Sequence, residues 1–182
     1  ILLWFDLINS PKGKIPMGSE IIMSQNPRFA IKAAGSFKQK EGCSNESIDS
    51  LSDERLDYLC AGECYNPSNE RNVIERIEVI KITPQIYSGE AISPLIQDPW
   101  LTLPCQETGE CAVEFVDQNF SRDSVYYVRV IQEATPAING SPLSQRDEFK
   151  LCKGSFRTDL QDNCLSMTNE RAWSSPIYIN KP

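Results

Sequence analysis

Alternation of apolar and polar side chains with a period of two is the feature that most constrains the fold of this chain. It is clearest at residues 126–131, where Tyr126, Val128 and Val130 alternate with residues 127, 129 and 131. Because successive side chains of a strand point to opposite faces of a sheet, this spacing predicts a half-buried strand. Related patterns predict six further strands, at residues 1–8, 21–23, 28–33, 73–82, 113–115 and 177–179.

The segment 73–82 has an apolar spacing that also fits a helix. Val73, Ile74, Ile77 and Ile80 would lie on one helical face. The segment is crowded with β-branched Ile and Val residues, which lose χ1 freedom in a helix and pack well on a pleated sheet. We therefore expect a strand here.

Three long connectors separate the expected strands, at residues 38–70, 84–110 and 134–172. In the first, Ser52 is followed by Leu56 and Leu59, which predicts one short helix with Ser52 as its N-cap. Seven short strands joined in this way predict an all-β fold, an antiparallel β-sandwich that covers residues 1–182 as a single domain. Loops of this length are uncommon in compact domains, so they need a source of stability of their own.

The placement of the cysteines offers that source. Seven cysteines lie in or beside the connectors, namely Cys43, Cys60, Cys64, Cys105, Cys111, Cys152 and Cys164, and we expect none in a strand core. Local pairing suggests disulfides Cys105–Cys111 and Cys152–Cys164, while the three cysteines of the first connector share one disulfide and leave one thiol. Each bridge would stabilise the fold by about 2–3 kcal/mol. Disulfides form in oxidising compartments, so we expect an exported protein, periplasmic or extracellular.

The cysteines of the first connector allow a second interpretation, a metal site. Cys60-Ala-Gly-Glu-Cys64 has a spacing compatible with half of a structural zinc site, and Cys43 could be a third ligand. A tetrahedral site needs a fourth ligand, and the other cysteines form separate, distant pairs. We therefore favour disulfides and expect no cofactor.

Charge and the absence of histidine exclude several functions. The net charge is −7, with 18 basic and 25 acidic residues, which argues against a nucleic-acid-binding protein. The excess acid lies in residues 41–70, which hold eight acidic residues and one basic residue. The chain has no His, which excludes Ser-His-Asp and Cys-His nucleophile systems and every His-ligated zinc site. We expect no membrane span, because the apolar run at residues 1–8 is far shorter than a bilayer requires.

Three aspartates of the acidic region, Asp49, Asp53 and Asp57, recur every four residues. On a single helix they would share one face, and their oxygen atoms are the ligand type that Ca²⁺ takes. Like charges at this spacing repel each other, and the EF-hand pattern is absent. A solvated acidic loop is therefore the favoured interpretation.

Aromatic and basic residues are mixed at Tyr127, Arg129, Arg171 and Trp173, a combination typical of binding surfaces. In a sandwich such residues more often pack on a sheet face, with an arginine lying over an aromatic ring. We take these four residues as a candidate interaction surface. Nothing in the sequence singles out a catalytic pair of carboxylates, so an enzyme that uses carboxylates alone is the least favoured function.

Several segments, taken in chain order, resemble one known family. They are Ile1-Leu-Leu-Trp-Phe-Asp-Leu7, Met17-Gly-Ser-Glu20, Ala34-Gly-Ser-Phe37, Cys64-Tyr-Asn-Pro-Ser-Asn-Glu-Arg71, Ile74-Glu-Arg-Ile-Glu-Val79, Asp98-Pro-Trp100, Tyr126-Tyr-Val-Arg-Val-Ile131 and Glu170-Arg-Ala-Trp-Ser-Ser-Pro-Ile177. The series is similar to the C-terminal portion of large, usually exported bacterial proteins of unknown function. The N-terminal portion of those proteins resembles PHP-type (polymerase and histidinol phosphatase) metal-dependent phosphoesterases. The resemblance covers nearly the whole chain, and its last block is the most specific.

The resemblance implies that the chain is the C-terminal fragment of a larger hydrolase. The family's metal site uses His and acidic residues upstream of this chain, so no catalytic or metal-binding residue carries over and we expect no enzyme activity. We expect an accessory domain that contacts the upstream catalytic domain of the same polypeptide, through the edge of residues 1–8 or the face of residues 126–131. The alternative is a stand-alone carbohydrate- or ligand-binding module in which Trp100, Tyr127 or Trp173 stacks on the ligand.

Overall fold

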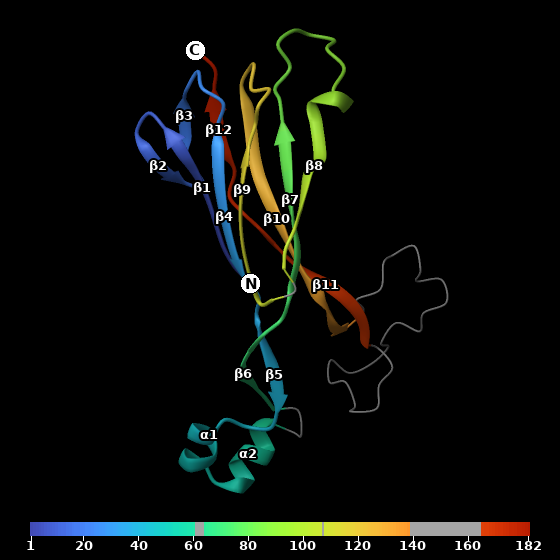
Figure 1. Cartoon of the computed structure of the whole chain (residues 1–182). Helices are drawn as coiled ribbons and strands as arrows, with labels where there is room; N and C mark the ends of the chain where they lie inside the picture. Colours follow the sequence, from blue (N-terminus) through green and yellow to red (C-terminus); the bar gives the residue numbers. More distant parts are fainter. Residues whose placement is uncertain (61–63, 107, 139–164) are drawn as a thin grey trace, which may run out of the picture. The chain divides into compact units, whose positions relative to one another are not determined.

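The computed structural model describes residues 1–60, 64–106, 108–138 and 165–182, and these are mostly β-strand (Figure 1). The chain separates into two compact units. Unit 1 consists of Ile1–Ser36, Asn72–Glu133 and Glu170–Pro182. Unit 2 consists of Phe37–Arg71 and Ala134–Asn169.

The first sheet of unit 1 has four antiparallel strands in the order β2-β1-β4-β9. Their bounds are Leu2–Ser10 for β1, Gly13–Pro16 for β2, Arg28–Ala34 for β4 and Glu110–Val116 for β9. Strand β1 lies between β2 and β4, so the exposed edge expected at residues 1–8 is covered by β2 in its second half, whereas β2 pairs with no residue before Asp6. The reason is that the turn after β1 returns the chain as β2, which pairs with Asp6, Leu7 and Ser10.

The second sheet has the strand order β3-β12-β10-β7-β8, and β11 also pairs with β10. The bounds are Glu20–Ile22 for β3, Ile74–Ile82 for β7, Ile96–Pro104 for β8, Ser124–Ile138 for β10, Leu165–Trp173 for β11 and Ile177–Asn180 for β12. A 3₁₀ turn, η1 (Ser93–Leu95), precedes β8. Pairing is antiparallel from β12 to β8, whereas β3 joins β12 in parallel.

The two sheets pack face to face around one hydrophobic core. Phe29 of β4 stacks on Phe5 of β1 and Phe115 of β9, and its ring centroid lies 4.8 Å from that of Tyr126 in the opposite sheet. Val128 supplies a further fully buried side chain. Removing a side chain of this size from water stabilises the fold by about 1.5–3 kcal/mol, so these inward positions define the sandwich.

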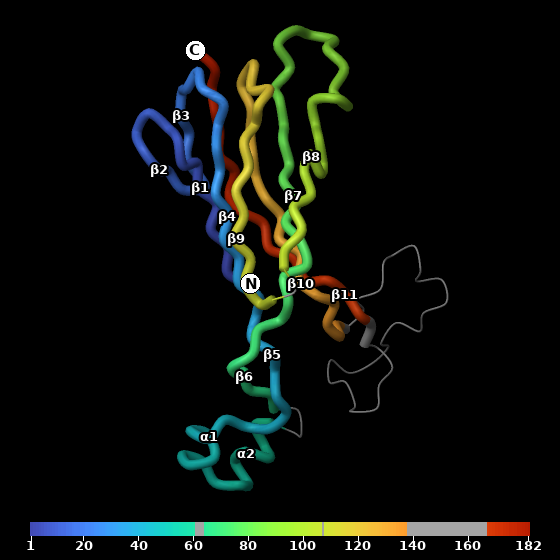
Figure 2. Tube along the Cα trace, viewed as in Figure 1, coloured from blue at the N-terminus to red at the C-terminus, as the bar shows by residue number. Residues whose placement is uncertain are grey.

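In unit 2 the acidic connector forms two strands and two helices, and Figure 2 traces the chain from the first strand into the helices. The bounds are Phe37–Glu41 for β5, Asn45–Ser50 for α1, Asp53–Cys60 for α2 and Tyr65–Arg71 for β6. Strands β5 and β6 pair in antiparallel fashion. The Oγ of Ser52 accepts a hydrogen bond of 3.3 Å from the backbone N–H of Arg55, as the expected N-cap requires.

The mainly-β, antiparallel fold class expected from the sequence is confirmed. All seven expected strands are present, and 73–82 is a strand, β7, rather than a helix. The described residues contain further strands in the connectors, and α1 adds a second helix to the one expected. Cys111 lies within β9 and is buried in the core, which corrects the expectation that no cysteine occupies a strand core. Among the helices of the described ranges, none has the length and apolar character needed to cross a bilayer.

Candidate functional site

An apolar row crosses the outer face of the second sheet, the face turned away from the sandwich core. Tyr178 of β12 pairs with Val125 of β10, which pairs with Ile82 of β7, which pairs with Ile96 of β8. Ile177 and Ile179 beside Tyr178, and Tyr126 beside Val125, point into the core, so alternation turns Tyr178 and Val125 outward. Ile82 pairs in register with Val125, and Ile96 with Ile82, so both lie on the same face. Tyr178 is 44% exposed and Ile96 is 50% exposed, and the two between them are half-buried. We call these four residues the apolar row.

The next position along the strands pairs Tyr127 of β10 with Ile80 of β7. Ile80 is fully buried although it does not belong to the core between the sheets. Its burial therefore arises on the outer face, beside the half-buried Tyr127. The outer face thus has apolar packing of its own next to the apolar row.

A cluster of ion pairs borders this apolar surface. Arg129 of β10 donates to Glu78 of β7 from Nε over 2.6 Å and to Asp98 of β8 from Nη2 over 2.9 Å. The Nε of Arg76 donates to the other carboxylate oxygen of Glu78 over 2.9 Å. Burial opposes the ionisation of Glu78, but the hydrogen bonds and positive charges of Arg76 and Arg129 hold its pKa below the ordinary value. Arg76 also pairs with Glu75 over 3.2 Å, so the cluster joins two guanidinium groups to three carboxylates and leaves neither arginine unpaired.

Arg171 and Trp173 of β11 also belong to this outer face. Ala172 between them packs against the core, so alternation turns its two neighbours the other way. The backbone N–H of Ser174 donates to the carbonyl of Val128 over 3.0 Å, which places this end of β11 beside β10. Trp173 is 57% exposed. The four residues expected to form an interaction surface, Tyr127, Arg129, Arg171 and Trp173, therefore lie on one face of one sheet.

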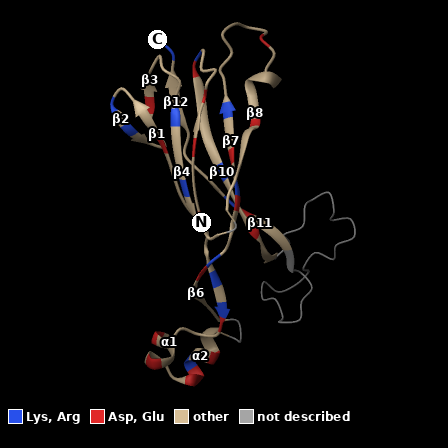
Figure 3. Cartoon of the chain, viewed as in Figure 1, with Lys and Arg blue, Asp and Glu red and all other residues tan. Residues whose placement is uncertain are grey.

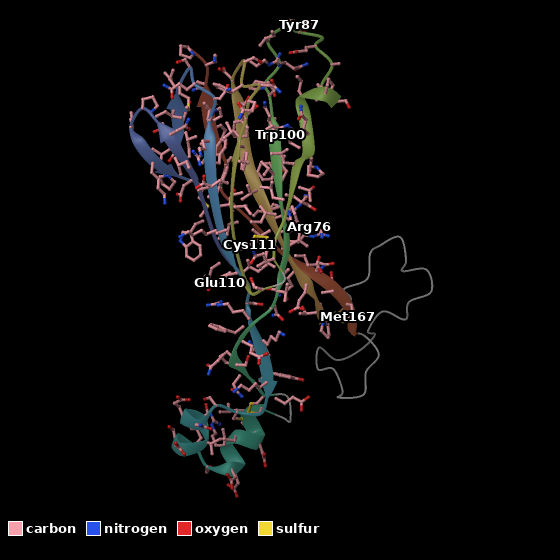
Figure 4. All side chains as sticks on the ribbon, in the orientation of Figure 1. Arg76, Tyr87, Trp100, Glu110, Cys111 and Met167 are labelled. Atoms are coloured by element: carbon pink, nitrogen blue, oxygen red, sulfur yellow. A yellow bond between two sulfur atoms is a disulfide. The ribbon has the colours of Figure 1, made fainter. Side chains whose placement is uncertain are left out.

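Trp100, the third aromatic residue expected as a stacking platform, lies elsewhere. Its ring centroid is 6.0 Å from that of Phe115 and 6.1 Å from that of Tyr126, and both of those rings are in the core. The ammonium group of Lys81 lies 5.1 Å from its ring centroid. Figure 4 labels Trp100 among the side chains of unit 1. This position is a packing position between the sheets, and it corrects the expectation of a stacking role.

A buried polar network joins the two sheets, and sequence reasoning did not anticipate it. Asp117, which follows β9, is 1% exposed and pairs with Lys81 of β7. The hydroxyl of Tyr126 donates to the same carboxylate over 2.6 Å, and the N–H of Asn119 donates to its other oxygen over 3.0 Å. Burial, followed by the hydrogen bond and negative charge of Asp117, raises the pKa of Tyr126 far above its ordinary value. The network satisfies a buried carboxylate, so its role is to hold the sheets together.

The five cysteines of the described ranges occupy two separate places. Cys105 and Cys111 form a disulfide with a Cα–Cα distance of 5.6 Å, which ties the end of β8 to β9 (Figure 4). In unit 2, Cys60 and Cys64 form a disulfide with a Cα–Cα distance of 5.0 Å, and Cys43 is a free thiol. The expected pairing of Cys152 with Cys164 falls outside the described residues.

The zinc site considered for the first connector is disfavoured by the bonding of its cysteines. The sulfur atoms of Cys43, Cys60 and Cys64 lie within 4.8 Å of one another, which is the spacing a metal ion could span. Two of them are bonded to each other, and only thiolates are strong metal ligands.

The aspartates of the first connector do not form one row. Asp49 lies on α1, whereas Asp53 and Asp57 lie on α2, and all three are exposed. Figure 3 shows the acidic positions of both helices in red. Because the helix is interrupted at Leu51 and Ser52, the three carboxylates do not stack on a single helical face.

Comparisons with known proteins give no relative from which a function could be transferred. No protein-family model, curated protein or solved structure matches the chain. The outer face of the second sheet and the cysteine cluster of unit 2 are therefore the features of the described chain that bear on function.

Proposed function

We propose that this chain is a non-catalytic interaction domain of an exported, metal-dependent hydrolase, and that it docks onto its partner through the outer face of the second sheet. The observation that carries the proposal is the apolar row of Tyr178, Val125, Ile82 and Ile96, which is aligned in register across four strands. Exposed apolar residues scattered singly are ordinary on proteins, whereas contiguous ones mark interaction surfaces.

The charges next to the apolar row favour docking onto a protein. Arg129 and Arg76 are engaged by carboxylates of Glu75, Glu78 and Asp98, so this border leaves neither guanidinium group unpaired. A border whose guanidinium groups are already paired lowers the cost of removing water when a protein surface covers the row, because unpaired charges are the most expensive groups to desolvate. Trp173 beyond the cluster offers an aromatic side chain of the kind enriched at interface hot spots.

The partner in this proposal is the upstream catalytic domain of the same polypeptide. The resemblance to the C-terminal portion of PHP-related exported proteins supports this partner, and an exported location is compatible with the two disulfides. Catalysis would belong to the partner domain, where the resemblance places the metal-binding histidines. This chain would contribute stability and one wall of the substrate cleft.

A carbohydrate-binding module is the second candidate. The observation that favours it is the exposure of Trp173 and Tyr178 on the same face, because sugars stack on open aromatic rings. Against it, Trp100 is packed between the sheets, and Trp4 is on β1 of the other sheet. The three tryptophans, all of them in the described ranges, are thus divided among different surfaces rather than arranged in one platform.

Hydrogen exchange on the complete parent polypeptide tests the docking proposal. We expect the amides of β12 and β8 to exchange at least tenfold more slowly in the parent than in this chain alone, because docking covers their outer face. Ile96→Lys should abolish that difference, whereas Ile86→Lys should preserve it, since Ile86 is an exposed loop residue outside the face. Equal exchange in the parent and the isolated chain would refute the docking proposal.

Glycan binding by the isolated chain distinguishes the second candidate. Titration with soluble oligosaccharides should give no heat of binding if the outer face is a protein-docking surface. Saturable binding that Trp173→Ala removes, and that Trp4→Ala leaves intact, would favour the carbohydrate-binding module instead.

A further inference from the structure

The three cysteines of unit 2 form a cluster that the docking function does not use. The Sγ of Cys43 lies 3.0 Å from the Sγ of Cys60, which is itself bonded to Cys64. All three sulfur atoms lie within 4.8 Å of one another. A free thiol is thus placed against a disulfide, at a separation from which a new sulfur–sulfur bond needs only a small movement.

Local structure holds both possible partners of Cys60 at its side. Cys43 comes two residues after the end of β5, and Cys64 immediately precedes β6. The N–H of Gly42 donates to the carbonyl of Cys64 over 2.8 Å, so the two ends of the ladder meet at these cysteines. Helix α2 ends at Cys60 and delivers its sulfur to the same place. Cys60 can therefore bond either neighbour without rearrangement of the strands.

The cluster opens to solvent. A pocket of 340 Å³ is lined by all three cysteines together with Leu56 and Tyr65, among others. Cys43 is half-buried, so its thiol can exchange a proton with water. The thiolate is the nucleophile in disulfide chemistry, and solvent access is what allows it to form and react.

We propose that Cys43, Cys60 and Cys64 form a thiol–disulfide exchange site in which Cys60 is the shared sulfur. The thiol of Cys43 loses its proton to solvent, and the thiolate attacks the Sγ of Cys60. The bond from Cys60 to Cys64 breaks as the bond from Cys43 to Cys60 forms, and Cys64 leaves as a thiolate that takes up a proton. One disulfide and one thiol are present before and after, so the step needs no oxidant or reductant.

The two bridges differ in what they tie together. Cys60–Cys64 links α2 to the start of β6 over a separation of four residues, whereas Cys43–Cys60 spans 17 residues and closes both helices onto β5. In an unfolded chain the shorter loop would close more readily, because the entropy lost on closure grows with loop length. The folded ladder already holds both partners beside Cys60, which removes most of that difference. We therefore expect a measurable population of the Cys43–Cys60 isomer.

Tryptic mapping under non-reducing conditions distinguishes the Cys60–Cys64 disulfide from the Cys43–Cys60 disulfide. Cleavage after Lys40, Arg55 and Arg71 gives peptides 41–55 and 56–71. Cys60–Cys64 is a bridge within the second peptide, whereas Cys43–Cys60 joins the two. The whole chain is incubated at pH 8, alkylated with a maleimide at increasing times and then digested. We expect both the internal bridge with the label on Cys43 and the joined peptides with the label on Cys64.

Two variants and an internal control make the outcome decisive. Cys64→Ser should give the joined peptides quantitatively after air oxidation, and Cys43→Ser should give the internal bridge alone. Cys105–Cys111 lies within peptide 82–122, and it should stay intact throughout because Cys43, the free thiol of the described residues, is placed against Cys60 instead. The proposal would be overturned if Cys43 of the native chain were completely labelled at all times and if Cys43 and Cys60 were both labelled in Cys64→Ser. A bridge from Cys43 to Cys152 or Cys164 would also overturn it.

Discussion

At the scale of single residues, the most consequential side chain is Tyr126, which is in the core and in the polar network at once. Its ring packs against Phe29, and its hydroxyl donates to the buried carboxylate of Asp117. A hydrogen bond to a buried charged acceptor contributes more than a neutral one, because the acceptor would otherwise lose part of its solvation without compensation. Tyr126 therefore contributes both a buried ring to the core and a hydrogen bond to the charged carboxylate of Asp117.

Tyr126→Phe should lower the free energy of unfolding by about 2 kcal/mol at neutral pH, since Asp117 keeps only Lys81 and the N–H of Asn119. The native pKa of Tyr126 is raised above the unfolded value of about 10. Its contribution is therefore complete below about pH 10 and is lost as the pH rises above it. Urea unfolding at pH 7, 9 and 11 measures both effects. Tyr127→Phe is the control, and an equal loss in that variant would contradict the assignment.

Glu78→Gln should remove an acid-sensitive part of the stability. The pKa of Glu78 lies below its unfolded value, so its contribution is present above about pH 4.3 and is lost as the pH falls through the native pKa. At pH 7 we expect a loss of about 1–2 kcal/mol, because two guanidinium groups each lose their pairing with the buried carboxylate of Glu78. Urea unfolding measured between pH 6 and pH 3 should show a smaller fall in the unfolding free energy for the variant than for the native chain.

Glu114→Gln supplies the matched control for Glu78. Glu114 pairs with Arg28 on the outer face of the first sheet, where both side chains are at least half exposed. Exposed pairs of this kind contribute about 0–1 kcal/mol. If this variant lost as much stability as Glu78→Gln, the burial of the Glu78 pairs would not be the cause.

At the scale of elements, the sequence could predict a strand wherever one face of the strand is buried. Strands β4, β7, β9, β10 and β12 alternate because their inward side chains meet the opposite sheet. All five residues of β5 are exposed, so no alternation marks it, and β6 combines polar residues with Pro67. Strand β8 contains Pro99, which is an unfavourable signal for a strand.

Part of the candidate site can likewise be predicted from the sequence pattern, and part of it cannot. Alternation in β10 places Tyr127 and Arg129 on a common face, and a single sequence is enough to see this. The apolar row depends on the register of β10 with β12 and of β7 with β8, which brings Tyr178, Ile82 and Ile96 into line. Register between distant strands is fixed by the packing of the whole sandwich, so the pattern within any one segment does not contain it.

Gly35, at the end of β4, is a position where one element approaches another so closely that no side chain fits. A Cβ at this position would lie 2.0 Å from the carbonyl oxygen of Asn72. Gly35→Ala should therefore lower the unfolding free energy by about 2–3 kcal/mol, because the backbone at Asn72 has to move. Gly89→Ala is the control, because Gly89 has a φ of 94° and a Cβ added to it would meet no atom within 4 Å. Thermal unfolding should show the smaller loss, about 1 kcal/mol, for the control.

At the scale of the whole molecule, the core is confined to one of the two units. Every buried residue of the described ranges belongs to unit 1. Helices α1 and α2 have no buried residues, and helices as short as these are not stable in water by themselves. Their order depends on the Cys60–Cys64 disulfide, on the caps at Ser44 and Ser52, and on the β5–β6 ladder.

Removal of the Cys60–Cys64 disulfide should therefore unfold the helices while the sandwich stays folded. In the double variant Cys60→Ser/Cys64→Ser, we expect the amides of α1 and α2 to approach the exchange rates of an unstructured chain. The amides of β4, β7 and β10 should keep their native protection, because their stability comes from the buried side chains of unit 1.

The matched control is Cys105→Ser/Cys111→Ser, which removes a disulfide from unit 1. It should speed exchange at the β8–β9 connection, lower the unfolding free energy of the sandwich by about 2 kcal/mol and leave the helices unchanged. Hydrogen exchange followed by mass spectrometry resolves these segments. If the loss of Cys60–Cys64 accelerated exchange equally in β4, β7 and β10, the two units would unfold as one, and the disulfide would stabilise the whole chain rather than the helices.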